Sequence, residues 1–245
     1  MNTATAGNTI MYTVDAQNFQ KVPGNPIAYW VGQVLFNVFA DSASLSSVGD
    51  SRQGLITGNN DRFLRCWYEI DLCKISCFNG SEWFPYNKGG EFRKWFGNNI
   101  LVVNWKNDGY DIKNYKDEKG KLLSRPQNVQ YYGKESITWT ALTSGIFNGR
   151  YSPEGYMFDA KGSSYFVKTE TVWNILSYLN SCVANYILSV TAPTLDFNAG
   201  VVAKLPYKRV EEKQVEELAI KNTNIARVDW DSFETSWNFK KHPLI

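Results

Sequence analysis

Short apolar runs separated by polar turns predict several brief strands along the chain. The clearest is Asn99–Trp105 (NILVVNW), which is rich in β-branched residues and bounded by polar residues on both sides. Ser136–Thr143 (SITWTALT) alternates between apolar and polar positions, as a half-buried strand does. Further short strands are expected at Gly54–Thr57, Phe63–Leu72 and Gly155–Phe158.

The strongest helical pattern covers Thr171–Val190, which is apolar on nearly every side. Its length approaches that of a membrane span, but Asn and Ser residues interrupt it, and neither end carries flanking Lys or Arg. We therefore expect a helix in the core or against a partner domain. Other helices are expected at Ile27–Phe39, in the amphipathic segment Val210–Asn222 and in the aromatic tail Val228–Ile245.

The remaining segments are expected to be loops and turns. Met1–Tyr12 is small and polar and is expected to fray, and the charged segment Lys113–Arg125 is expected to be an exposed insertion. Turns or loops are also expected at Gln20–Trp30, Asp41–Asp50, Gly58–Asp61 and Asp159–Ser164. Together these elements predict an α/β fold of the mixed α+β kind, with a twisted sheet that carries loops and helices packed beside it.

The composition is that of a folded globular chain with little net charge. Hydrophobic residues make up 43% of the 245 residues and charged residues 20%, which suits one large domain, or a domain with a smaller appendage. The net charge of +2 is low for a free-standing, non-specific DNA-binding protein. If nucleic acid is the partner, positive charge must be local or come from another part of the complex. Nine Trp residues exceed what most cores of this size use.

The cysteines and the single histidine give no metal signature. Cys66, Cys73, Cys77 and Cys182 show no CxxC spacing, and His242 is the one histidine of the chain. Structural, reduced cysteines and no bound metal are expected. No basic-then-apolar signal peptide opens the sequence, so the expected location is the cytoplasm.

The motifs of common catalytic sites are missing from the sequence. His242 lies four residues from the end, away from any Ser or Cys nucleophile motif. The sequence contains no GxSxG elbow, Walker loop or GxGxxG motif. The neighbouring acids Asp108 and Asp111, and Asp117 and Glu118, lie in hydrophilic segments where solvated charge explains them. The sequence therefore does not support an autonomous catalytic site of a common type.

Gly54–Ile70 (GLITGNNDRFLRCWYEI) concentrates side chains that recognise bases. An Asn amide pairs with an adenine edge and an Arg guanidinium with a guanine edge. The candidates after the Gly-flanked turn are Asn59, Asn60, Arg62 and Arg65. The structural alternative is that the two Asn side chains satisfy the turn and that Arg65 pairs with Glu69 on the surface. The sequence leaves both interpretations open.

Trp83–Asn99 (WFPYNKGGEFRKWFGNN) is the second such segment. A glycine pair before Glu91–Phe96 could leave backbone N–H groups free at a helix start, which suits a phosphate. Lys88, Arg93 and Lys94 are the candidate phosphate ligands, and a capped surface helix is the alternative. The aromatic residues could stack on an extruded or single-stranded base, although core packing is expected for at least two of them. They are Trp83, Tyr86, Trp95 and Phe96.

Arg150–Phe166 (RYSPEGYMFDAKGSSYF) repeats this mixture of residues. Arg150 and Tyr151 lead into a turn, and Ser163 and Ser164 could cap a helix or bind a phosphate. Each signal is weak by itself. Three such segments in a chain without a catalytic set indicate a recognition surface.

At these segments the chain resembles the C-terminal specificity half of PglX-type adenine-specific DNA methyltransferases, the modification enzymes of BREX phage-defence systems. GLITGNNDRF is also similar to the opening of target-recognition domains in type IIG and TaqI-like methyltransferases. Besides the runs Gly54–Ile70 and Trp83–Asn99, the resemblance rests on GNPIAYW (Gly24–Trp30), NWKNDGYDIKNY (Asn104–Tyr115), ITWTALTSGIFNGRYSPEGYMFDAKGSSYF (Ile137–Phe166) and LNSCVANYILSVTAPTLDFNAGVVAKLP (Leu179–Pro206).

The resemblance implies a target-recognition domain at residues 1–206 with a helical extension, residues 207–245, packed on it. Such methyltransferases carry a SAM-binding motif and an NPPY-type motif in an N-terminal catalytic domain; neither is found here, since NPIAYW is not that motif. The implied function is recognition of a short sequence in duplex DNA for a catalytic domain that binds S-adenosylmethionine, with no cofactor in this segment and no membrane partner. A segment of a longer protein is favoured over a separate gene product.

Two other functions remain open. The chain could be a protein-interaction module whose aromatic surface docks another defence-complex subunit or a phage inhibitor, which the small net charge favours. An autonomous enzyme is the third interpretation, and the missing motifs speak against it.

Overall fold

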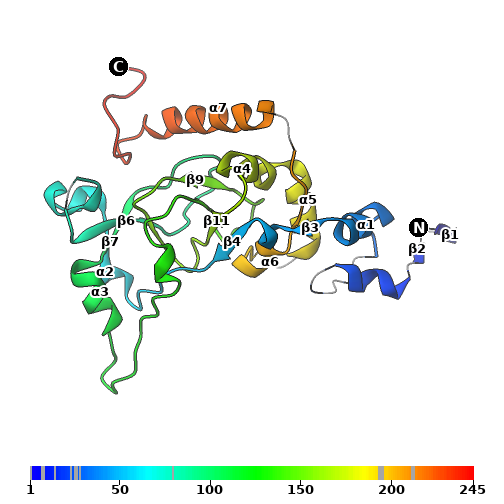
Figure 1. Ribbon diagram of the computed structural model, residues 1–245, viewed down its shortest axis with the longest axis horizontal. Coiled ribbons are helices and arrows are strands. Elements are labelled where there is room, and N and C mark those ends of the chain that lie inside the picture. Colours follow the sequence, from blue (N-terminus) through cyan, green and yellow to red (C-terminus); the bar gives the residue numbers. More distant parts are fainter. Residues whose placement is uncertain are drawn as a thin grey trace.

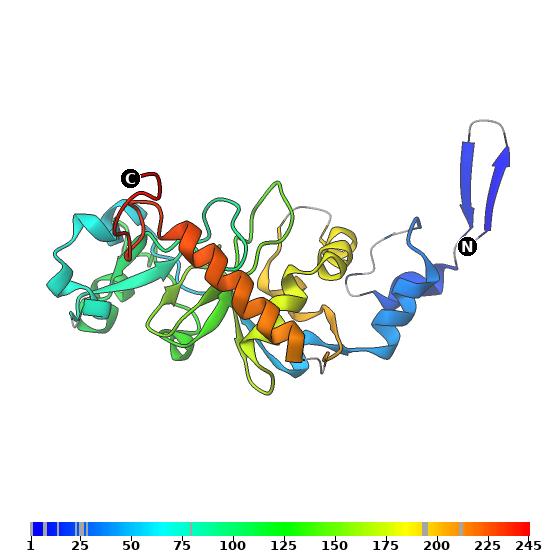
Figure 2. The same cartoon turned by 90° about the horizontal axis from the view of Figure 1, so that it is seen from above.

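The computed structural model of the chain describes residues 2–6, 9–13, 15–22, 24, 27, 29–78, 80–192, 196–210 and 213–245. The molecule is elongated, with two four-stranded sheets in its body and the long C-terminal helix α7 (Lys213–Trp230) lying along its length (Figure 1). An N-terminal hairpin stands away from the body at one end (Figure 2). The architecture is mixed α+β, as the sequence predicts.

The first sheet has the strand order β4-β11-β8-β9, with every neighbouring pair antiparallel. Ser164 of β11 pairs with Arg52 of β4 on one side and with Thr138 of β8 on the other. All three residues of β8 are buried, because this strand lies inside the sheet, so the expected half-buried alternation is absent. The strands are β4 (Gly49–Arg52), β8 (Ser136–Thr138), β9 (Arg150–Ser152) and β11 (Ser164–Val167).

The second sheet has the order β10-β6-β7-β5. Strands β6 and β10 run parallel, whereas β6–β7 and β5–β7 are antiparallel. The strand predicted at Asn99–Trp105 is confirmed as β7, and the one predicted at Gly155–Phe158 is confirmed in part as β10. The strands are β5 (Leu64–Cys66), β6 (Trp83–Asn87), β7 (Leu101–Asn104) and β10 (Met157–Phe158).

Two predicted strands are shorter than expected. In Gly54–Thr57 only isolated bridges form, from Leu55 to Asp159 and from Ile56 to Arg125. Gly54 allows this close approach, because a Cβ there would lie 1.9 Å from the Phe158 carbonyl oxygen. The strand expected over Phe63–Leu72 ends at Cys66, where a 3₁₀ turn begins.

The predicted helix Thr171–Val190 is two helices, α4 (Val172–Asn180) and α5 (Cys182–Thr191). Ser181 between them is extended, with φ −70° and ψ 158°, and its side chain accepts a hydrogen bond from the Ala184 N–H. The prediction of one helix was therefore wrong, since Ser181 ends one helix and caps the next. Both helices bury apolar faces in the core, as expected.

The N-terminal third departs most from the sequence prediction. Strands β1 (Asn2–Ala6) and β2 (Thr9–Thr13) form an antiparallel hairpin where fraying was expected. Helix α1 (Gln33–Asp41) begins later than predicted, after Gly32. The predicted loop Asp41–Asp50 contains β3 (Ala43–Ser44), which pairs with β12 (Pro206–Tyr207). The prolines of the predicted turn Gln20–Trp30 lie outside the described residues.

Short helical segments connect these elements. Helix α2 (Asn60–Phe63) follows the turn predicted at Gly58–Asp61, and α6 (Ala199–Ala203) precedes β12. Helix α3 (Lys106–Lys113) is kinked at left-handed residues and leads into the Lys113–Arg125 segment, which is mostly exposed as expected. The 3₁₀ turns are Ala16–Lys21, Leu45–Ser47, Trp67–Glu69, Leu72–Lys74, Ser76–Phe78 and Val129–Tyr131.

The C-terminal segment packs along the body. Helix α7 is longer than the predicted Val210–Asn222 and contacts α4, where the Thr171 hydroxyl donates to Glu216. The tail beyond Trp230 forms turns instead of the expected helix. Trp237 nevertheless packs back on the body, with its ring stacked on Trp67 at 5.3 Å between centroids. The domain boundary after residue 206 stays a prediction.

Two hydrophobic clusters form the core. The larger one joins the first sheet to α1, α4, α5 and α6, with Trp139, Leu176 and Leu188 fully buried. The smaller one lies under the second sheet and includes Tyr86 and Val103. The two sheets meet where the Asn87 amide donates to the Ser152 hydroxyl at 2.7 Å. Loops that leave either sheet at this junction therefore lie close together.

Candidate nucleic-acid interface

Two clefts meet at Lys88, the residue after β6. The first has a volume of about 420 Å³ and is lined by two stretches of chain together with Lys88. These stretches are 56–60 and 159–161. The structure thus brings together three of the predicted site residues, Asn59, Asn60 and Lys88, from positions almost thirty residues apart.

Asn59 and Asn60 both shape the turn before α2. The Asn59 Oδ1 accepts from the Arg62 N–H at 3.0 Å, and its Nδ2 donates to the Tyr115 hydroxyl at 3.2 Å. The Asn60 Oδ1 accepts from the Thr57 hydroxyl at 2.8 Å. The turn-forming alternative is therefore realised. The amide Nδ2 of Asn60, which no described residue engages, is the one of the four amide atoms left to meet a ligand.

Charge in the first cleft comes from two lysines and one carboxylate. Burial lowers the pKa of Lys88, against the opposing effect of Asp159. Burial also raises the pKa of Asp159, whose carboxylate accepts from the Tyr86 hydroxyl at 2.8 Å. Lys161 beside it is exposed, and its ammonium lies 3.9 Å from the Asp196 carboxylate. A half-buried ammonium with an incomplete set of partners is suited to an anionic ligand.

Arg62 and Arg65 lie near this cleft, but not in its lining. The exposed guanidinium of Arg62 stacks over the rings of Phe63 and Tyr115, at 5.2 and 5.1 Å. Arg65 donates to the backbone carbonyls of Asp61 and Leu64. The alternative pairing of Arg65 with Glu69 is not formed, because the Glu69 carboxylate accepts from the Cys66 N–H instead.

The second cleft, of about 720 Å³, lies on the other side of Lys88 between the Gly89–Gly90 loop and the end of α7. Arg93 lines it, pairs with Asp229 at 2.8 Å and stacks over Trp230 and Phe233 at 4.9 and 5.4 Å. Lys88 lines both clefts, and its ammonium group interacts electrostatically with the Asp159 carboxylate, which lines the first.

Four predicted site residues are buried in the protein or hydrogen-bonded within it. The Arg150 side chain is buried and donates to Asn148 Oδ1 at 2.7 Å, and burial lowers its pKa to about 10. Ser163 and Ser164 are also buried, since they enter and begin the inner strand β11, with no helix to cap. Lys94 donates to the Asn180 carbonyl at 3.2 Å, and burial lowers its pKa.

Three further expectations for this region are corrected or refined. No helix follows Gly89–Gly90, because residues 91–96 form bends and a bridge. The Tyr151 hydroxyl donates to Glu135 and its ring stacks on Trp173 at 4.7 Å, so it faces a structural partner. Of the aromatic candidates, Tyr86 and Phe96 are buried in the core as expected, whereas Trp83 and Trp95 are half-buried.

Some residues of the two clefts come from segments in which the sequence pattern predicts no site. Lys161 lies within the predicted turn Asp159–Ser164, so its exposure was foreseeable, although its neighbours were not. Trp230 and Phe233 were assigned to a tail helix, and only the packing of α7 brings them beside Arg93.

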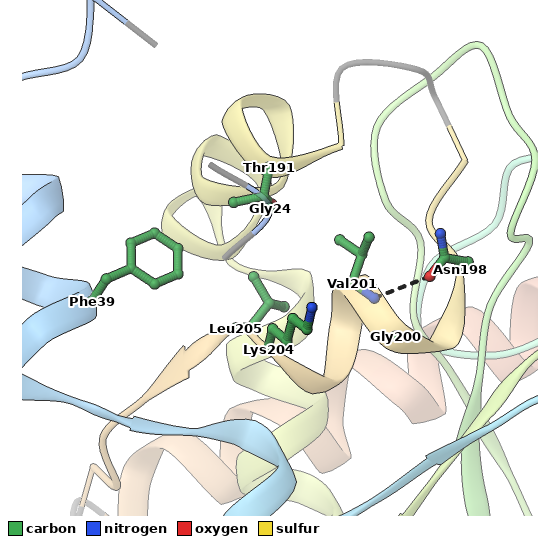
Figure 3. Close-up of a pocket in the computed structure, with 8 residues that line it drawn as sticks. All are labelled: Gly24, Phe39, Thr191, Asn198, Gly200, Val201, Lys204 and Leu205. Carbon is green, nitrogen blue, oxygen red and sulfur yellow. Dashed lines mark hydrogen bonds between the residues drawn. The ribbon is translucent and has the colours of Figure 1, made fainter. Parts of the chain in front are cut away.

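A third cavity, of about 210 Å³, lies between α1, α5 and α6 (Figure 3). Phe39, Val201 and Leu205 supply apolar walls, and the Val201 N–H donates to Asn198 Oδ1 at 3.1 Å. Among the described residues that line it, Lys204 alone is charged. None of the predicted site residues lines this cavity, so it is a packing gap outside the candidate interface.

Three properties of the described residues bear on other kinds of site. No group of three or more His, Cys, Asp or Glu side chains is arranged to hold a metal ion there. The four cysteines are unpaired, and Cys73, Cys77 and Cys182 are exposed. Within the same described ranges, no helix has both the length and the apolar character needed to cross a bilayer.

The fold is mixed α+β, and the proteins of similar sequence are named as adenine-specific methyltransferases. The chain is 40% identical to adenine-specific methyltransferase PglX of Lacticaseibacillus casei (strain Zhang) over 245 aligned positions, covering 96% of this chain and 20% of that protein. It is 38% identical to adenine-specific methyltransferase BrxX of Escherichia coli O9:H4 (strain HS) over 234 positions, covering 93% and 18%. No protein-family model matches the chain. The chain spans about a fifth of the length of these curated relatives.

Proposed function

We propose that this chain recognises a short sequence in duplex DNA and presents it to the catalytic domain of an adenine-specific DNA methyltransferase of a BREX or restriction-modification system. The catalytic domain would bind S-adenosylmethionine, and this segment would bind no cofactor. The similarity to two adenine-specific methyltransferases supports the enzyme class. The SAM-binding and NPPY-type motifs that the family resemblance implies for the catalytic domain have no counterpart in this sequence, which favours recognition over methyl transfer.

The observation that carries the proposal is the meeting of two clefts at Lys88. Side chains from three separate segments converge there: Asn60, Lys88 with Arg93, and Lys161. Cations that border a cleft can hold phosphates and fix the register of the duplex, while an amide or guanidinium at the base edges reads sequence. A local cluster of this kind also accounts for DNA binding by a chain with a net charge of only +2.

The test is binding of the chain to duplex DNA, measured by fluorescence anisotropy over a salt series. We expect affinity to fall steeply with salt, by about one decade per decade of salt for each phosphate neutralised. The double variant Lys88→Ala/Lys161→Ala should bind more weakly and should reduce the salt slope by about 2.

The matched control is Lys204→Ala/Lys221→Ala, which removes the same charge from residues outside both clefts. It should leave the slope within experimental error of the unmodified chain. Equal losses in the two double variants, or no salt-dependent binding by the unmodified chain with its catalytic half added in trans, would refute the proposal.

A protein-interaction module is the second candidate, and the outer face of α7 favours it. Ile220, Ile225 and Val228 line a shallow apolar groove there, and Val228 is 70% exposed. Contiguous exposed apolar side chains of this kind occur at protein interfaces. Salt-insensitive binding to another defence-complex subunit, lost in Ile225→Asp, together with no DNA binding, would select this candidate.

A further inference from the structure

The loop Gly89–Glu91, on the wall of the second cleft, has an unusual distribution of hydrogen bonds. Its carbonyl oxygens all accept from protein side chains: Gly89 from Arg150 and Asn98, Gly90 from Thr140, and Glu91 from Asn98. The three N–H groups donate to no described residue. Because the carbonyls are bound inward, the loop has three unused backbone donors in a row.

The conformation of the loop depends on glycine. Gly89 and Gly90 have φ angles of 101° and 99°, which side-chain-bearing residues rarely adopt. All three residues line the second cleft; Gly90 and Glu91 are exposed, whereas Gly89 is buried. Consecutive unpaired N–H groups in a turn of this kind form a concave site for an anion.

Cations stand on both sides of this loop. Lys88 precedes it and Arg93 follows two residues after it, and both line the cleft. Arg93 is already paired with the exposed carboxylate of Asp229, and the Glu91 side chain also lines the cleft. The carboxylates of Asp229 and Glu91 therefore oppose the binding of an anion in this cleft. An anion binds only if other positive groups outweigh them.

Arg150 supplies a further positive charge from behind the loop. Its guanidinium is fully buried and donates to the carbonyls of Gly89 at 3.3 Å and Arg93 at 3.4 Å. Its other partners are Asn148 and Thr140, which are neutral, and no described carboxylate forms an ion pair with it. A buried charge without a counter-ion costs free energy. An anion bound on the other side of the loop would offset part of that cost.

We propose that the Gly89–Glu91 loop is a phosphate-binding site, in which the free N–H groups hold the anion, Lys88 and Arg93 flank it, and Arg150 attracts it from behind. This inference rests on the proposed function in one respect: the phosphate is taken to be a backbone phosphate of duplex DNA. The chemistry recognised is a phosphate mono- or dianion, which a free phosphate ester would also present.

The experiment is a titration of the ¹⁵N-labelled 245-residue chain with sodium phosphate, with sodium chloride at equal ionic strength as the reference. We expect saturable shifts of the Gly89, Gly90 and Glu91 amide signals with phosphate only. The Gly145 and Gly155 amides, remote from the cleft, should stay unchanged. Equal shifts in phosphate and chloride would overturn the site.

Two variants test the charges. Glu91→Gln should bind phosphate more tightly by a few fold, whereas Glu118→Gln, which removes an equal charge outside the cleft, should change nothing. Arg150→Met should weaken phosphate binding on the order of tenfold, as the loss of a unit charge a few ångströms away predicts. Glu91 is exposed, so its variant keeps the test decisive if Arg150→Met does not fold. An unchanged affinity in Glu91→Gln would contradict the proposal.

A duplex DNA titration distinguishes the source of the phosphate. Shifts of the same amides with phosphate and with DNA support a backbone phosphate. Shifts with phosphate alone support the site for a smaller phosphate ester and count against the proposed function. DNA binding that leaves these amides unmoved would overturn the site while leaving the proposed function in place.

Discussion

Three side chains converge on the Asp50 carboxylate in β4. The Lys168 ammonium lies at 2.8 Å, the Arg52 guanidinium at 3.1 Å, and the Tyr131 hydroxyl donates at 2.5 Å. Burial raises the pKa of Asp50, but the hydrogen bonds from Lys168 and Tyr131 and the charge of Arg52 outweigh it and hold the pKa below its usual value. Asp50 therefore ties β4 to the residues that follow β11 and to the 3₁₀ turn at Tyr131.

The lowered pKa gives Asp50 a defined effect on acid stability. Its folded pKa lies below the unfolded value of about 3.9, so its contribution is present above that value and is lost as pH falls through the folded pKa. Asp50→Asn should lower the free energy of unfolding at pH 7 by about 1–3 kcal/mol and should flatten its decline between pH 5 and pH 3. Urea unfolding over this pH range measures both.

Asp41→Asn, at the exposed end of α1, is the matched control. Its free energy of unfolding should decline between pH 5 and pH 3 as that of the unmodified chain does. If Asp50→Asn shows the same decline from pH 5 to pH 3 as the unmodified chain, the contacts drawn to Asp50 do not set its titration.

The candidate site shows what single residues reveal before a structure is known. Asn59, Asn60 and Lys88 are polar residues near glycines, and local chemistry alone placed the two Asn residues at a turn and made Lys88 a candidate phosphate ligand; the strand β6 before Lys88 was not predicted. Arg150 has the same composition around it, but its burial depends on partners at Asn148, Gly89 and Arg93, two of them about sixty residues away. Exposure set by such distant contacts is not encoded in a local pattern.

At the level of elements, the break at Ser181 decides how the two core helices are oriented. The chain turns at an extended residue there, and the Ser181 Oγ accepts from the Ala184 N–H in the first turn of α5. Each helix is ten residues or fewer, too short to be stable alone. The cap and the packing of both helices against the first sheet therefore act together.

Ser181→Ala should lower the free energy of unfolding by about 1 kcal/mol, because the N-cap acceptor of α5 is lost. Denaturant unfolding at neutral pH measures this as a shift of midpoint with an unchanged m-value. Ser189→Ala in the same helix is the control. Its hydroxyl is on the exposed side and donates to the Tyr186 carbonyl, so its effect should stay within about 0.5 kcal/mol. Equal effects of the two variants would show that the cap contributes nothing.

The accuracy of the sequence prediction varies with the kind of element. Strand β7 was recognised because a β-branched run bounded by polar residues has few other solutions. The break at Ser181 was missed because the apolar pattern continues through it, and one polar residue does not reveal a change of direction. Strands β3 and β12 have two residues each and exist only through their pairing with each other, which no local pattern contains.

On the scale of the whole molecule, the C-terminal segment spans both sheets. Near its start, α7 contacts α4 of the larger core through Thr171–Glu216 and through Ser177, whose hydroxyl donates to the Val215 carbonyl. Near its end, the tail contacts the second sheet, where the Trp67 indole N–H donates to the Thr235 carbonyl. Trp237 stacks on Trp67 and donates to the Asn99 carbonyl. The segment therefore couples the two halves of the body.

Trp237→Ala should release the tail from the second sheet without releasing α7 from α4. Hydrogen exchange should become faster in residues 231–245 and in β5, while the α4 amides keep their protection. Trp237→Phe retains a ring for the stack but lacks the N–H donor. Its exchange rates in residues 231–245 and β5 should lie between those of the unmodified chain and those of Trp237→Ala. Equal acceleration in α4 and in the tail would mean that the segment is one cooperative unit with the body.

The strand order of the first sheet also bears on how the chain is made. β4 ends at Arg52, but its partner β11 begins at Ser164, so 112 residues must be added before the two can pair. At roughly 5–20 residues per second, that interval is about 6–22 s on the ribosome. During it β5, β6 and β7 can assemble with one another, whereas β4 lacks its neighbour. The nascent chain therefore carries an unpaired strand for seconds, and its yield should depend on chaperones that shield such edges.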